Sequence, residues 1–263
     1  MPANYKIALL MTLLAGLATV VGGFFTFFIK RTNIRALSIG LGFSAGVMIF
    51  LSFTEILQGA RGMLIKFFPH HADWFVFLGF ILGVIVAILI DYFIPDHIED
   101  DLFGPVENCT HQHRKIRRAG ILTAIAICIH NFPEGIATFF VATQNLTLGF
   151  SVAVAIAIHN IPEGIAVALP IYHATGKKRL AIWYTFLSGI SEPIGALLGL
   201  FVMQTFLPQA AIGFIFASVA GSMVYISFDT ILPLSRDYGD GHYSVFGIMS
   251  GIIFIWTSLL LLN

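Results

Sequence analysis

Long apolar stretches alternate with short polar segments along the whole chain. A helix of about 20 apolar residues crosses a bilayer, and eight stretches of that length can be placed. They lie near 5–29, 34–58, 73–95, 119–142, 147–171, 180–206, 211–233 and 244–262. The pattern therefore predicts an all-α polytopic membrane protein, in which eight transmembrane helices form a single domain over residues 1–263.

The composition supports this class. Hydrophobic residues make up 57% of the chain and charged residues 11%, against about 45–50% and about 25% in soluble proteins. The mean hydropathy is +0.89, so we expect the lipid bilayer to surround most of the chain. The net charge is zero, so we expect no nucleic-acid partner. The first stretch is too long for the apolar part of a signal peptide, and we expect it to remain as a helix.

The basic residues between the apolar stretches predict an orientation. Eleven Lys and Arg residues lie at one end of the spans and three at the other. Because cytoplasmic loops are the ones rich in Lys and Arg, we expect both termini to lie outside the cell (inner) membrane. The stretch 96–118, rich in histidine and acidic residues, then faces the cytoplasm. It is either a solvated linker or a weak metal-binding tract.

The outer helices carry an internal repeat. Segments 45–57 and 220–232 share seven of thirteen residues at an offset of 175, and glycines of the neighbouring helices match as well. Five crossings separate the two triplets, so they run in opposite senses across the membrane. The pattern predicts a 3+2+3 inverted-repeat arrangement with a substrate site at the repeat interface. The alternative is chance recurrence of the small residues that membrane helices favour.

The two central helices carry a repeated motif, AICIHNFPEGIA and AIAIHNIPEGIA, with its copies 29 residues apart. Helical positions i and i+4 share a face, so each His lies beside the Glu of its own motif. Imidazole, carboxylate and amide groups suit several divalent metals, and ionisable groups at membrane depth usually serve function. We therefore expect a metal site halfway across the bilayer, the alternative being an internally satisfied polar pair. The candidate metal ligands are His130, Asn131, Glu134, His159, Asn160, Glu163 and Glu192.

Prolines and a third helix add to this site. Pro133 and Pro162 cannot donate to the carbonyls of Ile129 and Ile158, and a free backbone oxygen in a membrane needs protein, water or an ion nearby. Glu192 brings another buried carboxylate, from the sixth predicted helix. It would widen the site to two ions, unless it only packs against hydroxyl groups.

Three further carboxylates lie toward the ends of their helices. Glu55 and Asp229 occupy near-equivalent positions of the repeat. They serve either as a relay in a vestibule or as interfacial caps, because a carboxylate near a helix end can reach water. Asp91 is interpreted as interfacial.

These features together resemble the ZIP family of divalent-metal transporters, in particular its bacterial ZupT-like branch. The resemblance rests on the paired HNFPEG and HNIPEG motifs, the eight spans and the histidine-containing stretch before the first motif, and it covers essentially the whole chain. It implies import of zinc, with iron, manganese, cobalt and cadmium, by alternating access and without a catalytic cofactor. It also implies a homodimer in which one helix bundle moves against another.

The resemblance further implies a two-metal site. The first ion would take His130, Glu134, His159 and Glu163, and the second would take Asn131, Glu134, Asn160, Glu163 and Glu192. Two other functions compete with transport. An intramembrane zinc metallohydrolase would need a dedicated base, as in HExxH, whereas Asn follows each His here. A metal-sensing receptor would need a sizeable cytoplasmic domain, which the eight spans leave no room for.

Overall fold

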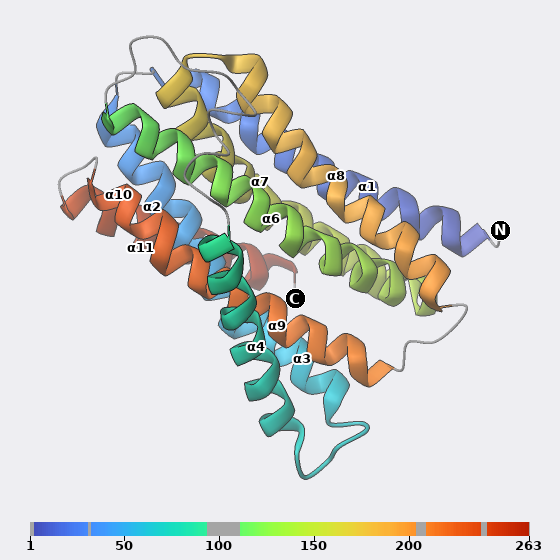
Figure 1. The fold of residues 1–263 in the computed structure, drawn as a ribbon. Helices are drawn as coiled ribbons and strands as arrows, with labels where there is room; N and C mark the ends of the chain where they lie inside the picture. The colour runs from blue at the N-terminus through green and yellow to red at the C-terminus, as the bar shows by residue number, and fades with distance from the viewer. Residues whose placement is uncertain (1–2, 31–32, 94–110, 204–208, 238–240, 263) are drawn as a thin grey trace.

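The computed structural model describes residues 3–30, 33–93, 111–203, 209–237 and 241–262 (Figure 1). No strand occurs within these ranges. In chain order the helices are α1 (Ala3–Phe25), α2 (Ile34–Leu51), α3 (Leu57–Leu64), α4 (Ala72–Phe93), α6 (His111–Gln144), α7 (Leu146–Thr175), α8 (Lys178–Met203), α9 (Gln209–Ile226), α10 (Leu232–Asp237) and α11 (Gly241–Leu262).

Eight helical segments of the described chain are long and apolar enough to cross a membrane, with α2–α3 and α9–α10 each counted as one. The predicted all-α fold with eight transmembrane helices is therefore confirmed. The largest differences lie at helix ends. The second span continues to Leu64 and α6 begins at His111, because Gln, Lys and Arg are good helix formers beyond the apolar stretch. Part of the stretch 96–118 is thus helical, and residues 96–110 lie outside the described residues.

A π-helical turn interrupts two of the spans at equivalent positions of the repeat. These turns are η2 (Ser52–Ile56) and η3 (Ser227–Ile231), which begin 175 residues apart, the same offset as the sequence repeat. In each turn the first serine hydroxyl donates to the carbonyl four residues earlier, at 2.7 and 2.8 Å. Single π-helical turns often occur at functional sites.

The helices form two groups. Helices α1, α6, α7 and α8 pack on one another as one bundle, while α2 packs along α11 and α4 packs along α9 (Figure 1). The second group meets the bundle mainly where α2 contacts α7 and where α9 contacts α6. Both helices that carry the repeated motif therefore belong to the bundle, and each also has a neighbour from the second group.

Glycines form the closest helix contacts, and these contacts come in pairs related by the repeats. A Cβ atom at Gly135 would collide with the backbone carbonyl of Glu192, and one at Gly164 would collide with that of Thr19. Three more pairs of contacts follow the same rule. Gly22 meets Ile161 as Gly195 meets Phe132, and Gly83 meets Ser218 as Gly251 meets Phe43. Gly221 meets Phe80 as Gly46 meets Ile248. Small residues let membrane helices approach closely. The 3+2+3 inverted-repeat arrangement itself stays a prediction.

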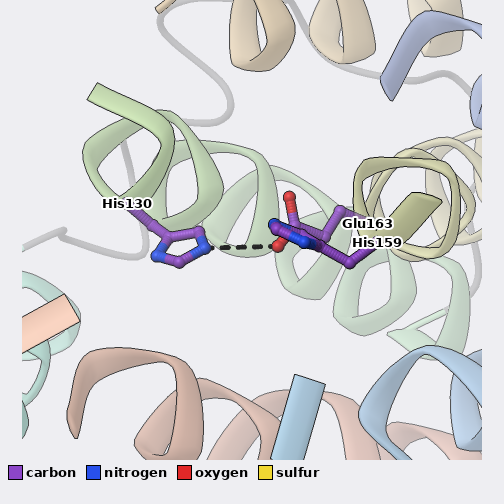
Figure 2. A group of neighbouring side chains, drawn as sticks. All are labelled: His130, His159 and Glu163. Carbon is purple, nitrogen blue, oxygen red and sulfur yellow. Dashed lines mark ion pairs between the residues drawn. The ribbon is translucent and has the colours of Figure 1, made fainter. Parts of the chain in front are cut away.

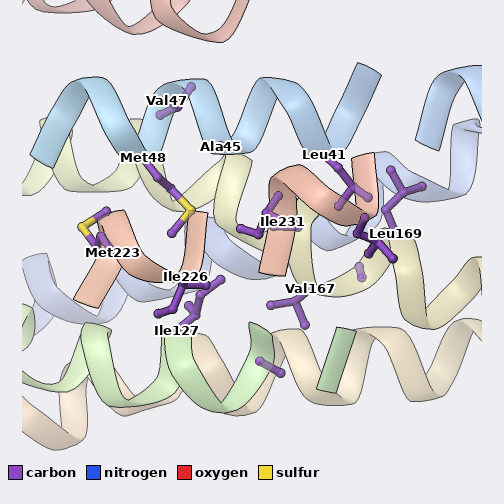
Figure 3. Packing of buried hydrophobic residues seen from close by; sticks show 14 of the residues in the cluster. Leu41, Ala45, Val47, Met48, Ile127, Val167, Leu169, Met223, Ile226 and Ile231 are labelled. Carbon is purple, nitrogen blue, oxygen red and sulfur yellow. The ribbon is translucent and has the colours of Figure 1, made fainter. Parts of the chain in front are cut away.

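The main apolar core lies where α2, α6, α7 and α9 meet (Figure 3). Met48, Ile127, Val167 and Met223 are fully buried there. Since close packing leaves side chains little freedom, this core holds α6 and α7 of the bundle against α2 and α9 of the second group.

A buried hydroxyl cluster joins α2, α10 and α11. The hydroxyl of Ser38 donates to the carbonyl of Ser235, and the hydroxyl of Ser235 donates to the carbonyl of Ser38, both at 2.7 Å. The hydroxyl of Ser244 lies 2.8 Å from that of Ser235. All three residues are fully buried, so the cluster fastens these three helices together.

Candidate metal centre

The two copies of the motif lie on neighbouring helices of opposite direction. The first copy is on α6 and the second on α7, and both helices continue through the prolines of the motif. Only residue 145 separates the two helices, and Gly149 packs against Ala142 across the turn. Each copy falls near the middle of its candidate span, so equivalent side chains face one another at the same depth.

All seven candidate ligands are buried. None exposes more than 4% of its surface, and Asn131, Asn160, Glu163 and Glu192 expose none. Charged groups are almost never buried to this extent unless they are paired or bind a metal. Within the described chain, no Lys or Arg forms an ion pair with these carboxylates, whose recorded ion-pair partners are histidines.

The histidines and glutamates of the two motifs cross over. His130 Nε2 lies 3.2 Å from Glu163 Oε1, and His159 Nε2 lies 3.0 Å from Glu134 Oε1. Within the first motif His130 Nε2 is 3.7 Å from Glu134 Oε2. His130 and Glu163 are close but lack the alignment of a hydrogen bond. Both histidines thus direct a nitrogen toward the glutamate of the other helix.

A compact set of donor atoms results. One atom each from His130, His159 and Glu163 lies within 4.8 Å of the others. Figure 2 shows His130 reaching from α6 toward Glu163 and His159 of α7. Nitrogen and oxygen donors bind zinc at about 2.0–2.2 Å, and an ion placed among such atoms would bring them into its coordination shell with small side-chain movements.

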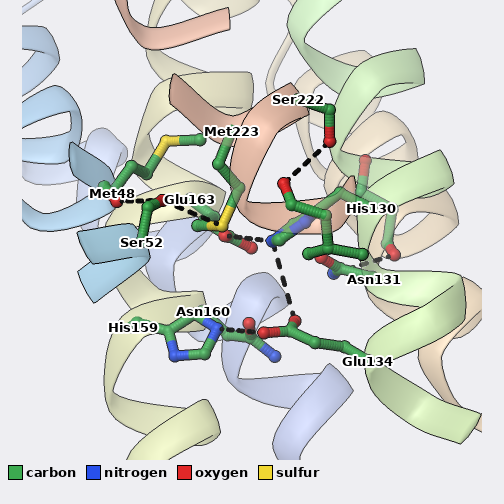
Figure 4. Close-up of polar contacts among 12 residues, drawn as sticks. Met48, Ser52, His130, Asn131, Glu134, His159, Asn160, Glu163, Ser222 and Met223 are labelled. Carbon is green, nitrogen blue, oxygen red and sulfur yellow. Dashed lines mark hydrogen bonds and ion pairs between the residues drawn. The ribbon is translucent and has the colours of Figure 1, made fainter. Parts of the chain in front are cut away.

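The two asparagines extend the site toward α1 and α8 (Figure 4). Asn131 Nδ2 donates to the carbonyl of Ser188 at 3.2 Å, and Asn160 Nδ2 donates to the carbonyl of Ala15 at 2.8 Å. Asn160 Nδ2 also donates to Glu192 Oε2, at 2.8 Å. These bonds hold the amides in place and leave their oxygens as acceptors. Glu192 is thereby tied to the second motif.

Several acceptor oxygens in this cluster receive no hydrogen bond. Among the described residues, nothing donates to the side-chain oxygens of Asn131 and Asn160, to either oxygen of Glu163 or to Glu192 Oε1. A buried polar group without a partner costs about 1–3 kcal/mol, and more when it is charged. A bound cation satisfies several such oxygens at once, so the arrangement is suited to divalent metal.

A cavity of about 230 Å³ adjoins the site between α4, α6 and α9. Its lining includes His130 and Pro133 of the first motif and reaches Asp91 near the end of α4. The structure therefore places Asp91 on a cavity shared with a candidate ligand, although the sequence suggested only an interfacial role. Glu55 is solvent- or lipid-exposed on η2 and is not brought to the site.

The motif also meets the second group of helices through one hydrogen bond. The buried hydroxyl of Ser44, on α2, donates to the carbonyl of Pro162 at 2.6 Å. Sequence reasoning missed Ser44 and Ser188, because neither the spacing of the motif nor the repeat shows which distant helix faces it. Thr19 did carry a signal, because it matches Glu192 at an offset of 173, which also relates Gly22 to Gly195. Its buried hydroxyl has no partner among the described residues.

Comparisons with known proteins identify the family. A family model described as ZIP Zinc transporter matches residues 104–258. The zinc transporter ZupT of Akkermansia muciniphila is 47% identical over 255 residues, which is 94% of each chain. The ZupT proteins of Nitratidesulfovibrio vulgaris and Clostridium perfringens are 46% and 42% identical and cover 98% of this chain and 98% and 96% of their own. The chain belongs to the ZIP family.

Membership of the ZIP family settles the general function. The chain is a multi-pass membrane protein that transports divalent metal, with zinc as a transported substrate. It is a transporter rather than an enzyme, and neither a metallohydrolase nor a metal-sensing receptor is favoured. The resemblance inferred from the paired motifs is therefore confirmed.

Proposed function

We propose that this ZIP transporter carries zinc into the cytoplasm by alternating access, and that it also admits iron, manganese, cobalt and cadmium. The donor set supports a broad range, because imidazole nitrogens suit zinc, iron and cobalt while carboxylate and amide oxygens also suit manganese. No thiolate takes part, and this favours reversible binding over tight storage.

The observation that carries the proposal is the cluster of buried acceptors without donors at the point where the motifs meet. Glu163 has both oxygens in this state, and one of them lies 3.2 Å from His130. We propose that Glu134 and Glu163 bridge two ions. The first ion binds beside the two histidines and the second beside Asn131, Asn160 and Glu192. The hydrogen bond from Asn160 to Glu192 keeps the second group of ligands together.

The cavity beside His130 supports a route for the metal. It extends from the first motif to Asp91, near the end of α4 that leads to the stretch 96–118. By the positive-inside rule we assign this end to the cytoplasm. We therefore propose an inward-facing conformation, with both termini outside the cell (inner) membrane. From the family resemblance we also propose a homodimer as the functional assembly.

The direct test is zinc uptake by the full-length protein in sealed proteoliposomes. Replacing Glu163 with Gln keeps the size of the side chain but removes the negative charge that binds both metal ions in our proposal. Uptake should fall to the rate of protein-free vesicles. The matched control is Asp237→Asn, which makes the same chemical change at an exposed position of α10 and should leave uptake unchanged.

Two results would contradict the assigned site. Full zinc uptake by the Glu163→Gln protein would exclude a bridging role for this carboxylate. An equal loss in the Asp237→Asn protein would show that any lost charge impairs transport. Rates for zinc, iron and manganese measured on the same vesicles test the proposed range of substrates.

A further inference from the structure

An apolar furrow runs along the outer face of the bundle, between α1 and α8. Its volume is about 530 Å³. The two helices lie side by side in Figure 1, and each contributes a stripe of large side chains at helical spacing. The stripes are Val20, Phe24 and Phe27 from the end of α1 and from the 3₁₀ turn η1 (Thr26–Phe28), and Ile182, Trp183 and Phe186 from α8.

Aromatic side chains form much of this furrow and are accessible from outside. Phe24 is 53% exposed and Trp183 is 56% exposed. Trp183 stacks on Phe186 with ring centroids 5.9 Å apart, and Phe24 meets Phe27 edge to face at the same distance. All these residues lie within candidate membrane spans. At this place the furrow faces the acyl chains of membrane lipids.

One end of the furrow is strongly basic. Lys178 and Arg179 line it, and a second cavity of about 520 Å³ shares these two residues and Trp183 and adds Lys177. All three basic residues are exposed, and none forms an ion pair with a carboxylate of the described chain. Lys178 Nζ lies 5.0 Å from the centre of the Phe27 ring, which holds this cation at the mouth of the furrow.

We infer that this furrow binds one anionic phospholipid, with its phosphate at Lys178 and Arg179 and an acyl chain along Phe24 and Phe186. The dimensions fit, because the nine residues from Lys178 to Phe186 span about 12 Å of helix, within the roughly 15 Å depth of one leaflet. Basic pockets between transmembrane helices on the cytoplasmic side are suited to anionic headgroups. A zwitterionic lipid would offer the same chain but no net charge for the three cations.

The test uses the tryptophan of the furrow as a reporter. In the full-length protein Trp74 and Trp256 are replaced by Phe, which leaves Trp183 as the single tryptophan; both replaced residues are largely exposed, at 66% and 55%. The protein is reconstituted in phosphatidylcholine vesicles that contain a small fraction of brominated phosphatidylglycerol or brominated phosphatidylcholine. Bromine quenches tryptophan only at short range, so the ratio of the two quenching efficiencies reports headgroup preference at this furrow.

We expect brominated phosphatidylglycerol to quench Trp183 several-fold more effectively. Each basic residue near the membrane surface contributes about a fivefold preference, so Lys178→Gln with Arg179→Gln should lower the ratio several-fold. Arg35→Gln with Arg236→Gln is the matched control. It removes the same charge at the same end of the molecule, from α2 and α10, and should leave the ratio unchanged. Added salt should lower the ratio in the protein with both cations, because screening weakens exposed charge pairs.

Several outcomes would overturn the inference. Equal quenching by the two lipids would show that the furrow does not distinguish headgroups. A ratio that survives the loss of Lys178 and Arg179, or falls equally in the control pair, would show that these residues do not form the site. Glycerol phosphate has the headgroup chemistry without the chains. If an excess of it abolished the preference, the basic end would be a phosphate site rather than a lipid site.

Discussion

Replacing Gly135 with Ala tests whether the bundle geometry sets the metal centre. Gly135 follows Glu134 in the first motif, and a Cβ atom at this position would collide with the backbone carbonyl of Glu192 on α8. A backbone atom cannot move away by changing rotamer, so α6 and α8 must separate. Overpacking of this kind costs about 1–3 kcal/mol, and we expect the upper end. The better helix propensity of Ala offsets about 1 kcal/mol of this destabilisation.

The net expectation is a destabilisation of about 2 kcal/mol, or roughly a 30-fold change in the unfolding equilibrium. The separation also carries Glu192 away from Asn160, to which it is joined by a 2.8 Å hydrogen bond. Displaced supporting groups typically cost about 10–100-fold in metal affinity or activity, so initial zinc uptake should fall by at least about tenfold.

The measurements are thermal unfolding of the purified full-length protein and initial uptake of radioactive zinc in proteoliposomes. Gly59→Ala in α3 is the matched control, because a Cβ atom there meets nothing within 4 Å. It should stabilise the protein by up to about 1 kcal/mol through helix propensity and leave uptake unchanged. If Gly135→Ala instead unfolded at or above the wild-type temperature and transported zinc normally, the close α6–α8 contact would not control the site.

Two further substitutions test single hydrogen bonds. Ser44→Ala removes the 2.6 Å bond to the carbonyl of Pro162, which is worth about 0.5–1.5 kcal/mol. The maximal uptake rate should therefore shift by up to about tenfold while zinc binding in detergent changes much less; an unaltered rate would mean that the bond does not influence transport. Ser235→Ala removes the hydroxyl that bonds to Ser38 and lies beside Ser244, and thermal unfolding should show a loss of about 1–3 kcal/mol. Ser250→Ala is its control, since that hydroxyl bonds only within its own helix, and equal losses would contradict the role of the cluster.

The motif and the number of helices could be predicted because both depend on local sequence. Apolar length alone marks a membrane helix, and helical periodicity places each His beside the Glu of its own motif. The crossed pairs, His130 with Glu163 and His159 with Glu134, could not be predicted. They depend on how far α6 and α7 are rotated about their axes, and this rotation is set by packing against the other helices.

The contacts made by the second group of helices could also not be predicted from the sequence. Nothing in the chain near Ser44 indicates that its hydroxyl meets a carbonyl 118 residues away. The repeat related the sequences of these helices, but it did not indicate that Gly83 would meet Ser218 while Gly251 meets Phe43. The cavity that Asp91 lines could not be predicted for a similar reason, because a cavity is formed by several helices and has no linear signature.

The hydrogen bond between Ser44 and Pro162 gains meaning from its counterpart in the repeat. At the offsets of the two repeats these positions correspond to Val219 and Pro133. Both of those residues line the cavity beside His130. The junction of α2 and α7 is therefore closed by a hydrogen bond, whereas the repeat-related junction of α9 and α6 contains a cavity. Exchanging the two arrangements would open a passage at α2 and α7 and close the present one. The sealed junction at Ser44 therefore marks where we expect the entrance for incoming metal to form.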